Sequence, residues 1–490
     1  MPAVHSEAAT VAGFDPGRRR WITRTEIERG GSVAPLPGLD GELRIDEQAR
    51  EAVATDLGKI TYQRPSAVLR PRSARDIAAM VRFCQAHGLS VSPRGQAHTT
   101  CGQGLTEGVV VEMGCLDRIG EIGQESVEVE AGALWKDLAK AAYAHTPRRT
   151  PPVLTGYTSL SIGGTLSVGG VGGMVGGLRT GLQVDHVREL EVVTGTGEIV
   201  RCSRDIHPDL FDAVRGGLGQ CGIITKSVVE LVPVKERART YVLGYQDNAE
   251  FFRDLRMLIE RPSIDHVYAE FSSPDNIPTY KAFVTVFYDP DRSPDDASIL
   301  AGVDAEAEVQ DVDYLDHVFS IDDLIDPLRE TMGWDHLVKP WFDAWLPGSV
   351  VEDFIAEVQP GLTADDIGPF GAGLIYPQRR EEVSVSQPKL PLPDESGWVF
   401  AVDINTVSTS PDPEPGFTDQ MLERNGRLLA RTREHYGGVL YPIGSVPLSD
   451  KDWQAHFGDR WPAFRTAKDR YDPDHVLTPG PGIFSTGGST

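Results

Sequence analysis

Apolar residues follow two patterns along residues 59–234 of this 490-residue chain. Short runs rich in β-branched residues, such as GVVVEM at 108–113, predict buried strands. Other segments, such as LWKDLAKAAYAH at 134–145, repeat apolar residues at the spacing of a helix. The patterns predict strands at 89–93, 108–113, 126–132, 189–195, 198–202 and 222–234, and helices at 71–88, 134–145 and 209–217.

The pattern changes near residue 235. A strand and a helix are predicted within 235–260, and the runs at 265–272 and 281–289 are typical of strands. Further strands are predicted at 372–377 and 397–407, and a helix at 418–437. Strands and helices in this mixed order predict an α+β region built on an antiparallel sheet.

The composition of the chain disfavours several classes of function. The net charge of −25 disfavours binding to nucleic acid or to an anionic membrane. Five cysteines without C-x-x-C spacing predict neither a disulfide framework nor a zinc site, and we expect no metal. No run approaches the ~18 consecutive apolar residues of a membrane helix, and the N-terminus does not resemble a signal peptide. We therefore expect a cytoplasmic protein.

Two glycine-bearing stretches carry the candidate chemistry. The first, SPRGQAHTTCGQGLTEGVVVEM (92–113), places His98 in a loop between two strands. The second, at 156–187, has four pairs of glycines interleaved with Ser161, Thr165 and Ser167. Glycines let a backbone approach a ligand and expose amide groups to an anion, so this stretch is a candidate pyrophosphate cradle.

The second stretch matches neither common nucleotide motif. It lacks the G-x-G-x-x-G of dinucleotide-binding βαβ units and the Lys-Ser/Thr of the P-loop. The alternative is a flexible low-complexity loop, which the regular interleaving of apolar residues and hydroxyls disfavours.

The motifs together resemble a known superfamily. RGQAHTTCGQ and GYTSLSIGGTLSVGGVGG are followed by LEVVTGTGEIVRCS, HPDLFDAVRGGLGQCGIITKSVVEL and the terminal YDPDHVLTPGPGIF. This ordered series resembles the FAD-linked oxidases of the vanillyl-alcohol oxidase (PCMH-type FAD-binding) superfamily, and within it the cytokinin dehydrogenases. The resemblance covers 60–234 and returns at 440–484.

The resemblance implies a fold and a division into domains. The fold is α+β, with a two-subdomain FAD-binding unit and a substrate domain whose antiparallel sheet is flanked by helices. We expect the FAD-binding domain at 1–234 with its core at about 60–234, the substrate domain at 235–449, and a return to the FAD-binding domain at 450–490.

The resemblance also assigns a role to His98, which matches the histidine that holds FAD covalently in such proteins. The chemistry is reasonable, because a neutral imidazole nitrogen can add to the electrophilic oxidised flavin at its 8α-methyl carbon. The alternative is a histidine that is merely hydrogen-bonded within a turn. The cysteine of a second covalent linkage would stand near Tyr157, where the sequence has none.

Further cofactor contacts are implied by positions that match the family or carry the glycine-rich cradle. They are Gly95, Gln96, Ala97, Thr99, Gln103, Ser161, Gly163, Gly164, Thr165, Ser167, Val171, Ile224 and Thr478.

Three positions depart from the cytokinin dehydrogenase pattern. Gly156 stands where the family has the aspartate that takes a proton from the substrate nitrogen. Pro481 replaces a glutamine, and Ser445 stands near the place of an aromatic residue. The cofactor half is therefore kept, while the group that activates an adenine-type substrate is absent.

The base for the departing proton is left open among several residues. Tyr157 lies in the segment expected to face the flavin, Glu270 matches a glutamate at the substrate entrance, and Tyr376 lies on a predicted substrate-domain strand. His186 is a further candidate.

We expect an FAD-dependent oxidase or dehydrogenase that takes a hydride from a C–H next to N or O of a small molecule, for example in secondary metabolism. One alternative is a cytokinin dehydrogenase that cleaves N6-substituted adenines, and another is a non-catalytic flavin-binding protein. Besides this substrate, O2 or another electron acceptor is the expected partner. The sequence does not determine the oligomeric state.

Overall fold

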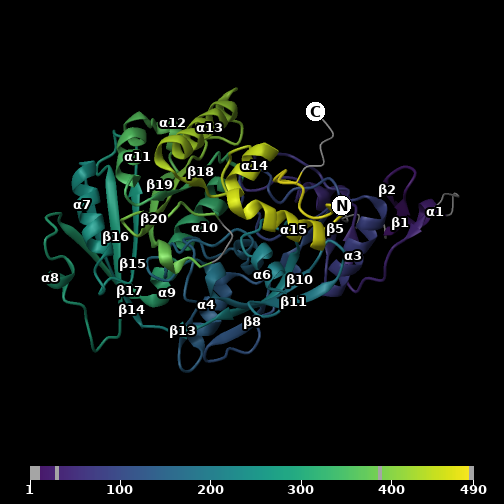
Figure 1. Ribbon diagram of the computed structural model, residues 1–490, viewed down its shortest axis with the longest axis horizontal. Coiled ribbons are helices and arrows are strands. Elements are labelled where there is room, and N and C mark those ends of the chain that lie inside the picture. Colours follow the sequence, from purple (N-terminus) through teal and green to yellow (C-terminus); the bar gives the residue numbers. More distant parts are fainter. Residues whose placement is uncertain (1–10, 28–32, 385–388, 485–490) are drawn as a thin grey trace, which may run out of the picture.

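The computed structural model describes residues 11–27, 33–384 and 389–484. In Figure 1, a large sheet with its helices occupies one side of the molecule, and the strands of the N-terminal part occupy the other. Helices α14 (Asp450–Phe457) and α15 (Trp461–Tyr471), drawn in yellow, lie between them. The predicted α+β class is confirmed.

A four-stranded sheet positions the loop that carries His98. Its order is β4-β5-β7-β6, in which β5, β7 and β6 run parallel. Helix α3 (Ala74–His87) connects β5 to β6 and ends at Gly88, whose φ of 61° favours glycine. The chain leaves β6 at Arg94 and returns to β7 through residues 95–108. The strands are β4 (Glu42–Arg44), β5 (Ala67–Arg70), β6 (Val91–Arg94) and β7 (Val109–Glu112).

The C-terminal segment lies along the free edge of β6. The Val91 amide donates to the Val476 carbonyl at 2.8 Å, and the Thr478 amide donates to the Val91 carbonyl at 2.9 Å. A buried ion pair of 2.6 Å joins Lys468 to Asp472, whose carboxylate also accepts from the Val476 amide. Residues 476–478 are therefore part of the structure that supports the His98 loop.

A second four-stranded sheet, antiparallel throughout, has the order β11-β10-β12-β8. Helices α4 (Trp135–Ala144), α5 (Ile162–Leu166) and α6 (Pro208–Val214) accompany it, and α15 packs against α6. Its strands are β8 (Ser126–Glu130), β10 (Val187–Val193), β11 (Ile199–Ser203) and β12 (Ile223–Glu230). Smaller sheets pair β1 (Val11–Asp15) with β2 (Arg20–Thr23) and β3 (Ala34–Pro35), and β9 (Arg149–Thr150) with β13 (Val232–Pro233).

The third large sheet has eight antiparallel strands in the order β17-β14-β16-β15-β19-β20-β18-β21. Helices α7 (Asn248–Ile259), α11 (Val351–Val358) and α13 (Phe417–Tyr436) pack together and cover one face. The strands are β14 (Arg237–Tyr245), β15 (His266–Phe271), β16 (Tyr280–Tyr288), β17 (Ala307–Asp313), β18 (Phe342–Pro347), β19 (Ala372–Arg379), β20 (Trp398–Asn405) and β21 (Val439–Leu440).

The period of two along these strands gives the sheet an apolar face and a polar face. In β20, Phe400, Val402 and Ile404 belong to the core under the helices. Asp403 and Asn405 alternate with them and line a cavity on the opposite face. The sheet thus presents polar side chains to the first part of the molecule.

The elements predicted from the sequence are present, with boundary shifts of a few residues. Three elements near the cavity are additional. Helix α5 lies inside the glycine-rich stretch, β18 is an apolar strand interrupted by Asp343, and α10 (Ser320–Met332) contains Pro327. The predicted domain boundaries remain predictions.

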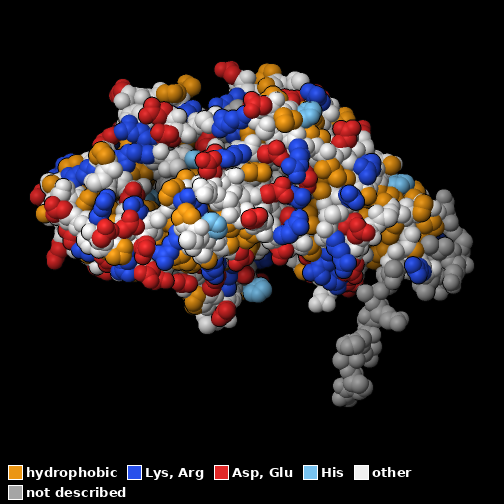
Figure 2. All heavy atoms as spheres, turned by 90° about the horizontal axis from the view of Figure 1, so that it is seen from below, with side chains coloured by type: hydrophobic (Ala, Val, Ile, Leu, Met, Phe, Trp, Pro, Cys, Tyr) orange, Lys and Arg blue, Asp and Glu red, His pale blue; other side chains and the backbone are white. Residues whose placement is uncertain are grey.

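The surface carries no basic stripe on the face shown in Figure 2, where acidic and basic side chains are mostly interspersed. Across the residues that the structure describes, no helix is long and apolar enough to cross a membrane.

Candidate active site

A cavity of about 700 Å³ lies between the glycine-rich segments and the polar face of the eight-stranded sheet. Every residue that the sequence predicted as a cofactor contact lines this cavity, from Gly95 in the His98 loop to Thr478 in the C-terminal segment. The three candidate bases Tyr157, Glu270 and Tyr376 line it as well. The structure therefore brings these separated segments to one site, while their individual roles remain predictions.

The His98 loop offers unpaired amides to the cavity. The backbone N–H groups of Gln96, Ala97 and His98 donate to no other group in the described part of the chain. Ala97 has a φ of 50°, a left-handed conformation that an alanine adopts only where the surroundings impose it. Consecutive free amides in such a turn form a concave site for an anion.

A buried carboxylate behind the loop holds this conformation. Asp56 accepts a hydrogen bond from the Gly102 amide at 2.6 Å and another from the Thr99 hydroxyl at 3.0 Å. It also accepts from the Gly58 amide at 3.1 Å. Burial raises the pKa of Asp56 to about 6, against these hydrogen bonds. The sequence offered no pattern that connected Asp56 with the loop.

The second glycine-rich segment packs on this loop with almost no space between them. A Cβ added to Gly95 would lie 2.0 Å from the Ser161 hydroxyl oxygen of the second segment. The same segment also packs on Ala131, which follows β8, and a Cβ added to Gly163 would lie 2.7 Å from the Ala131 Cβ. The Ser161 hydroxyl bonds to no other described residue, whereas the Thr165 and Ser167 hydroxyls bond within the protein. Of these hydroxyls, Ser161 is thus the one without a protein partner at the cavity.

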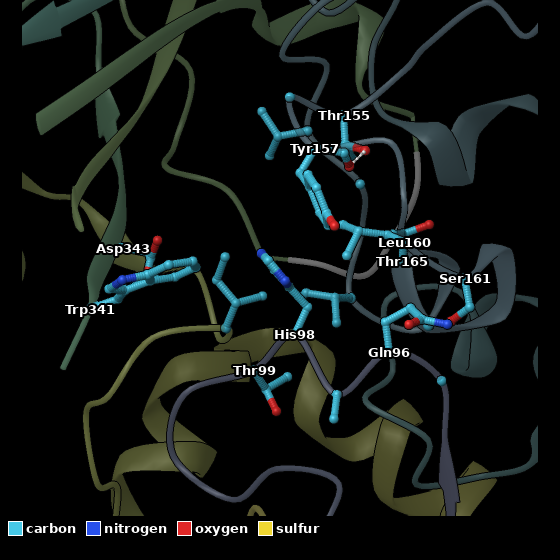
Figure 3. A pocket seen from close by; sticks show the side chains of 18 of the residues that line it. Gln96, His98, Thr99, Thr155, Tyr157, Leu160, Ser161, Thr165, Trp341 and Asp343 are labelled. Atoms are coloured by element: carbon cyan, nitrogen blue, oxygen red, sulfur yellow. Dashed lines mark hydrogen bonds between the residues drawn. The ribbon is translucent and has the colours of Figure 1, made fainter. Parts of the chain in front are cut away.

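His98 lies at the centre of the site, between two aromatic rings (Figure 3). Its ring is nearly parallel to that of Tyr157 at 5.5 Å, and at 66° to that of Trp341 at 5.5 Å. Neither ring nitrogen bonds to another described residue, although the ring lines the cavity. Burial, together with the positive charges of Arg329 and Lys339, lowers the pKa of His98 to about 3. The imidazole is therefore neutral near pH 7.

The hydroxyl of Tyr157 is turned toward helix α10 and is engaged there. It donates to Asp326 at 3.0 Å and accepts from Arg329. Burial raises the pKa of Tyr157 to about 12, which disfavours the phenolate that a base requires. The geometry instead favours a role in holding His98 against α10.

Helix α10 is fixed over the cavity by a second buried carboxylate. Asp322 accepts from the amide and hydroxyl of Thr158 at 2.9 and 2.8 Å, and from the amide and hydroxyl of Ser159 at 3.0 and 2.5 Å. Lys136 lies 3.6 Å from the same carboxylate. The apolar side of α10, including Ile325 and Leu328, faces the cavity.

Three carboxyls lie across the polar face of the sheet, and we call Glu270, Asp403 and Asp343 the carboxyl row. Glu270 is opposite Leu374, Leu374 is opposite Asp403, and Asp403 is opposite Asp343. Directly opposed residues of antiparallel strands project to the same face. All four line the cavity.

Burial raises the pKa of each carboxyl in this row. For Glu270 the nearby Lys281 opposes the effect. The neighbouring Asp403 also raises the pKa of Asp343. Burial raises the pKa of Asp403 to about 7, although a hydrogen bond with Asp343 opposes the rise. Burial likewise raises the pKa of Tyr376 well above its ordinary value.

Gly156 leaves open the place that the family aspartate would occupy. A Cβ there would lie 3.8 Å from the Tyr376 hydroxyl, which is ordinary contact. His186, by contrast, lies outside the cavity, where it bonds to Glu230 and to the Thr180 carbonyl. The structure thus gives no support to His186 as a base.

Comparisons with known proteins agree with this geometry. Residues 65–203 match the FAD binding domain model, and residues 296–484 match the model for cytokinin dehydrogenase 1, FAD and cytokinin binding. Cytokinin dehydrogenase 1 of Oryza sativa subsp. japonica is 32% identical over 93% of this chain and 94% of its own length. The chain belongs to the cytokinin dehydrogenase family.

The chain is also 34% identical to an uncharacterized oxidoreductase of Rhodococcoides fascians, ORF5 in the fasciation locus. The match covers 90% of this chain and 99% of that protein. Its fold is similar to that of glucooligosaccharide oxidase from Acremonium strictum, with a TM-score of 0.68 and 18% identity over 89% of this chain and 95% of that one. As a member of the family, the protein is an FAD-dependent oxidoreductase.

The residues present fit FAD. The cavity has free amides and the Ser161 hydroxyl for an anionic pyrophosphate, and two glycines, Gly95 and Gly163, where any side chain would collide. When bound, FAD supplies the two-electron acceptor of the reaction.

The sequence missed the carboxyls Asp343 and Asp403, as well as Arg329 and Lys339. A signal was available for Asp403, because a single charged residue alternates with Val402 and Ile404 in an otherwise apolar strand. Such a residue must face away from the core, toward water or a site.

Proposed function

We propose that this FAD-dependent oxidoreductase holds its flavin covalently through His98 and oxidises a C–H bond next to N or O of a small molecule. The observation that carries the proposal is the half-buried imidazole of His98, which lies at the centre of the cavity without a protein partner for either ring nitrogen. The glucooligosaccharide oxidase of similar fold carries an 8α-N1-histidyl FAD, which supports a histidine as the attachment point.

The residues around His98 serve this attachment. Tyr157 and Trp341 restrain the imidazole, while Arg329 and Lys339 disfavour its protonation. A neutral ring nitrogen keeps the lone pair that forms the bond to the cofactor.

The remaining groups orient the reactants. The amides of residues 96–98 hold the anionic part of the cofactor, and α10 with Trp341 shields the site from water. The carboxyl row supplies groups that bind a polar substrate and accept its proton.

Denaturation of the purified protein tests the attachment. We expect flavin fluorescence to stay with the polypeptide after acid or SDS treatment of the wild type, and to be released or absent in His98→Ala. Release from the wild type would contradict the covalent bond, and a protein that never contains flavin would contradict the proposal as a whole. His186→Ala, which removes a histidine that lies outside the cavity, serves as the matched control and should retain bound flavin.

Anaerobic bleaching of the flavin separates the remaining functions. A small amine or alcohol should reduce it, whereas N6-substituted adenines should not, because Gly156 offers no carboxylate at the position where the family aspartate meets the nitrogen of an adenine-type substrate. Bleaching by such an adenine would instead support a cytokinin dehydrogenase, and a protein that no compound reduces would be a flavin-binding protein only. Admission of O2 to the reduced protein then shows whether O2 is the acceptor.

A further inference from the structure

Asp343 and Asp403 form a buried pair of like groups at the substrate end of the cavity. They are direct partners on β18 and β20, with 0% and 9% of their surface exposed. Asp343 packs so tightly that a Cβ on Gly444 would lie 2.3 Å from its Oδ2. The buried site thus holds a pair of carboxyls, although two apolar residues in the same place would make folding more favourable.

Neither carboxyl is neutralised by the protein. No ion pair among the described residues includes Asp343 or Asp403. Both oxygens of Asp343 and the Oδ1 of Asp403 lack a hydrogen-bond partner outside the pair in the described part of the chain. A buried, unsatisfied carboxylate is costly unless a partner arrives from elsewhere.

The groups that face the pair from the neighbouring elements are acidic or neutral. They are Glu270 on β15, Tyr376 on β19, Tyr268 on β15, and Tyr441 after β21. Within the described residues, the one Lys or Arg that lines the cavity is Arg94, which lies at the end of β6 close to Asp56. The cavity is therefore acidic at the sheet and has its cation at the cofactor loop.

We propose that Asp343 and Asp403 bind the nitrogen of a basic aliphatic amine and accept its proton, so that the substrate is an amine that is protonated at neutral pH. An ammonium group supplies both the positive charge and the several N–H donors that the unpaired oxygens require. An alcohol supplies one donor and no charge. The aromatic rings of Trp334, Trp341 and Phe370 provide an apolar lining for the rest of the molecule.

The pair then takes part in a balanced oxidation. The ammonium proton moves to a carboxylate oxygen of the pair, which frees the nitrogen lone pair. The C–H bond on the adjacent carbon breaks, its hydrogen leaves with both electrons to oxidised FAD, and the lone pair forms the C=N bond of an iminium product. FAD is the oxidant and is reduced by two electrons.

This inference rests on the proposed function, because it names the substrate class of the same site. The two fail in different ways. Loss of flavin in the denaturation experiment contradicts the proposed function, whereas a flavin-loaded protein without amine preference contradicts only the role of the pair.

Cumylamine and cumyl alcohol are suitable probes, because they have the same shape and neither has a C–H bond on the carbon next to N or O. We expect the flavin-loaded wild type to bind cumylamine in titration calorimetry, and to bind cumyl alcohol at least about tenfold more weakly. Near pH 6 the pair holds a proton, so cumylamine binding should release a proton, detected by comparing buffers of different ionisation enthalpy. Cumyl alcohol should release none.

Asp403→Asn should weaken cumylamine binding at least about tenfold and reduce the proton release, with flavin content unchanged. Asn405→Ala removes a polar side chain from the same face of β20 and should keep both the preference and the release. Equal binding of the two probes, failure of the wild type to bind cumylamine, or cumylamine binding and proton release in Asp403→Asn that equal those of the wild type would overturn the proposal. Asp343→Asn repeats the test from β18, in case one variant does not fold.

Discussion

The two sides of the cavity are built in opposite ways. On the cofactor side the wall consists mainly of backbone, namely the amides of residues 96–98 and glycines such as Gly163. On the sheet side it has added charged side chains, and Asp343 and Asp403 face each other without a cation. The first wall provides hydrogen bonds from the backbone, and the second provides buried carboxyl groups whose pKa values are raised.

The difference indicates how each side responds to substitution. A wall of backbone has no spare volume, so an added methyl group should be harmful even without a change of charge. A wall of unpaired carboxyls is already under electrostatic strain, so removal of a charge should stabilise the fold while it harms binding. Four variants test this contrast.

The largest effect is expected where the two sides are joined. Asp322→Asn replaces a carboxylate that accepts four hydrogen bonds from Thr158 and Ser159, and an amide nitrogen then faces donors. The free energy of unfolding should fall by about 2–4 kcal/mol in denaturant titration, because at least one buried donor loses its acceptor. Asp323→Asn, on the exposed part of the same turn, should change it by less than about 0.5 kcal/mol. Equal effects of the two would contradict the link between α10 and the glycine-rich segment.

The cofactor side should be sensitive to a single methyl group. A Cβ at Gly173 would lie 2.4 Å from the Gly156 amide nitrogen, which cannot move without the backbone. Gly173→Ala should cost about 1–3 kcal/mol of unfolding free energy and reduce flavin content. The matched variant Gly104→Ala also lines the cavity, but its Cβ has its first neighbour at 3.8 Å, so it should be nearly neutral. Equal unfolding free energies of Gly173→Ala and Gly104→Ala would contradict the conclusion that the backbone wall has no spare volume at Gly173.

The sheet side should respond to loss of charge with increased stability. The pKa of Asp403 is raised to about 7, so the folded protein binds a proton that the unfolded chain releases near pH 4. The contribution of Asp403 to the free energy of unfolding of the wild type is therefore fully present below pH 4, and it is lost as the pH rises through 7. The asparagine in Asp403→Asn does not titrate. The free energy of unfolding of this variant should therefore exceed that of the wild type by an amount that grows from pH 4 to pH 7 and reaches about 1–2 kcal/mol at pH 8. A thermal melt series that shows destabilisation at pH 8 would contradict the electrostatic strain.

The smallest effect on stability is expected at the boundary between the sides. Gly156→Asp adds a side chain where the Cβ has ordinary contact with the Tyr376 hydroxyl at 3.8 Å, so folding should change by less than about 1 kcal/mol. Activity should change in kind, because the new carboxyl stands where the family aspartate accepts a proton. Anaerobic bleaching by an N6-substituted adenine should appear in the variant and be absent in Gly156→Ala. Identical behaviour of the two variants would show that Gly156 does not determine the substrate.

The cofactor side could be predicted from the sequence because its parts are local. Residues 95–104 and 161–167 are each contiguous, and no side chain fits at Gly95 or Gly163. Of the carboxyl row on the sheet side, Glu270 was predicted through the family resemblance, whereas Asp343 and Asp403 were not. Glu270, Asp343 and Asp403 come from three strands that are far apart in the sequence and meet only through the strand order β15-β19-β20-β18.

Helix α10 escaped the sequence analysis for a different reason. Pro327 lies within it and removes one of its backbone donors, which lowers the intrinsic preference for a helix. The helix is retained by tertiary contacts, namely the bonds from Asp322 to residues 158–159 and from Arg329 to Tyr157. Local preference and tertiary contact disagree here, and the tertiary contact determines the structure.

The pairing of residues 476–478 with the edge of β6 has a consequence for the order of events in the cell. The strand that leads into the His98 loop is bordered by chain that is synthesised almost four hundred residues later, and Thr478 itself lines the cavity. While that segment is still inside the ribosome, the site lacks one of its walls. We therefore expect the complete cofactor site to form only after residue 478 has left the ribosome.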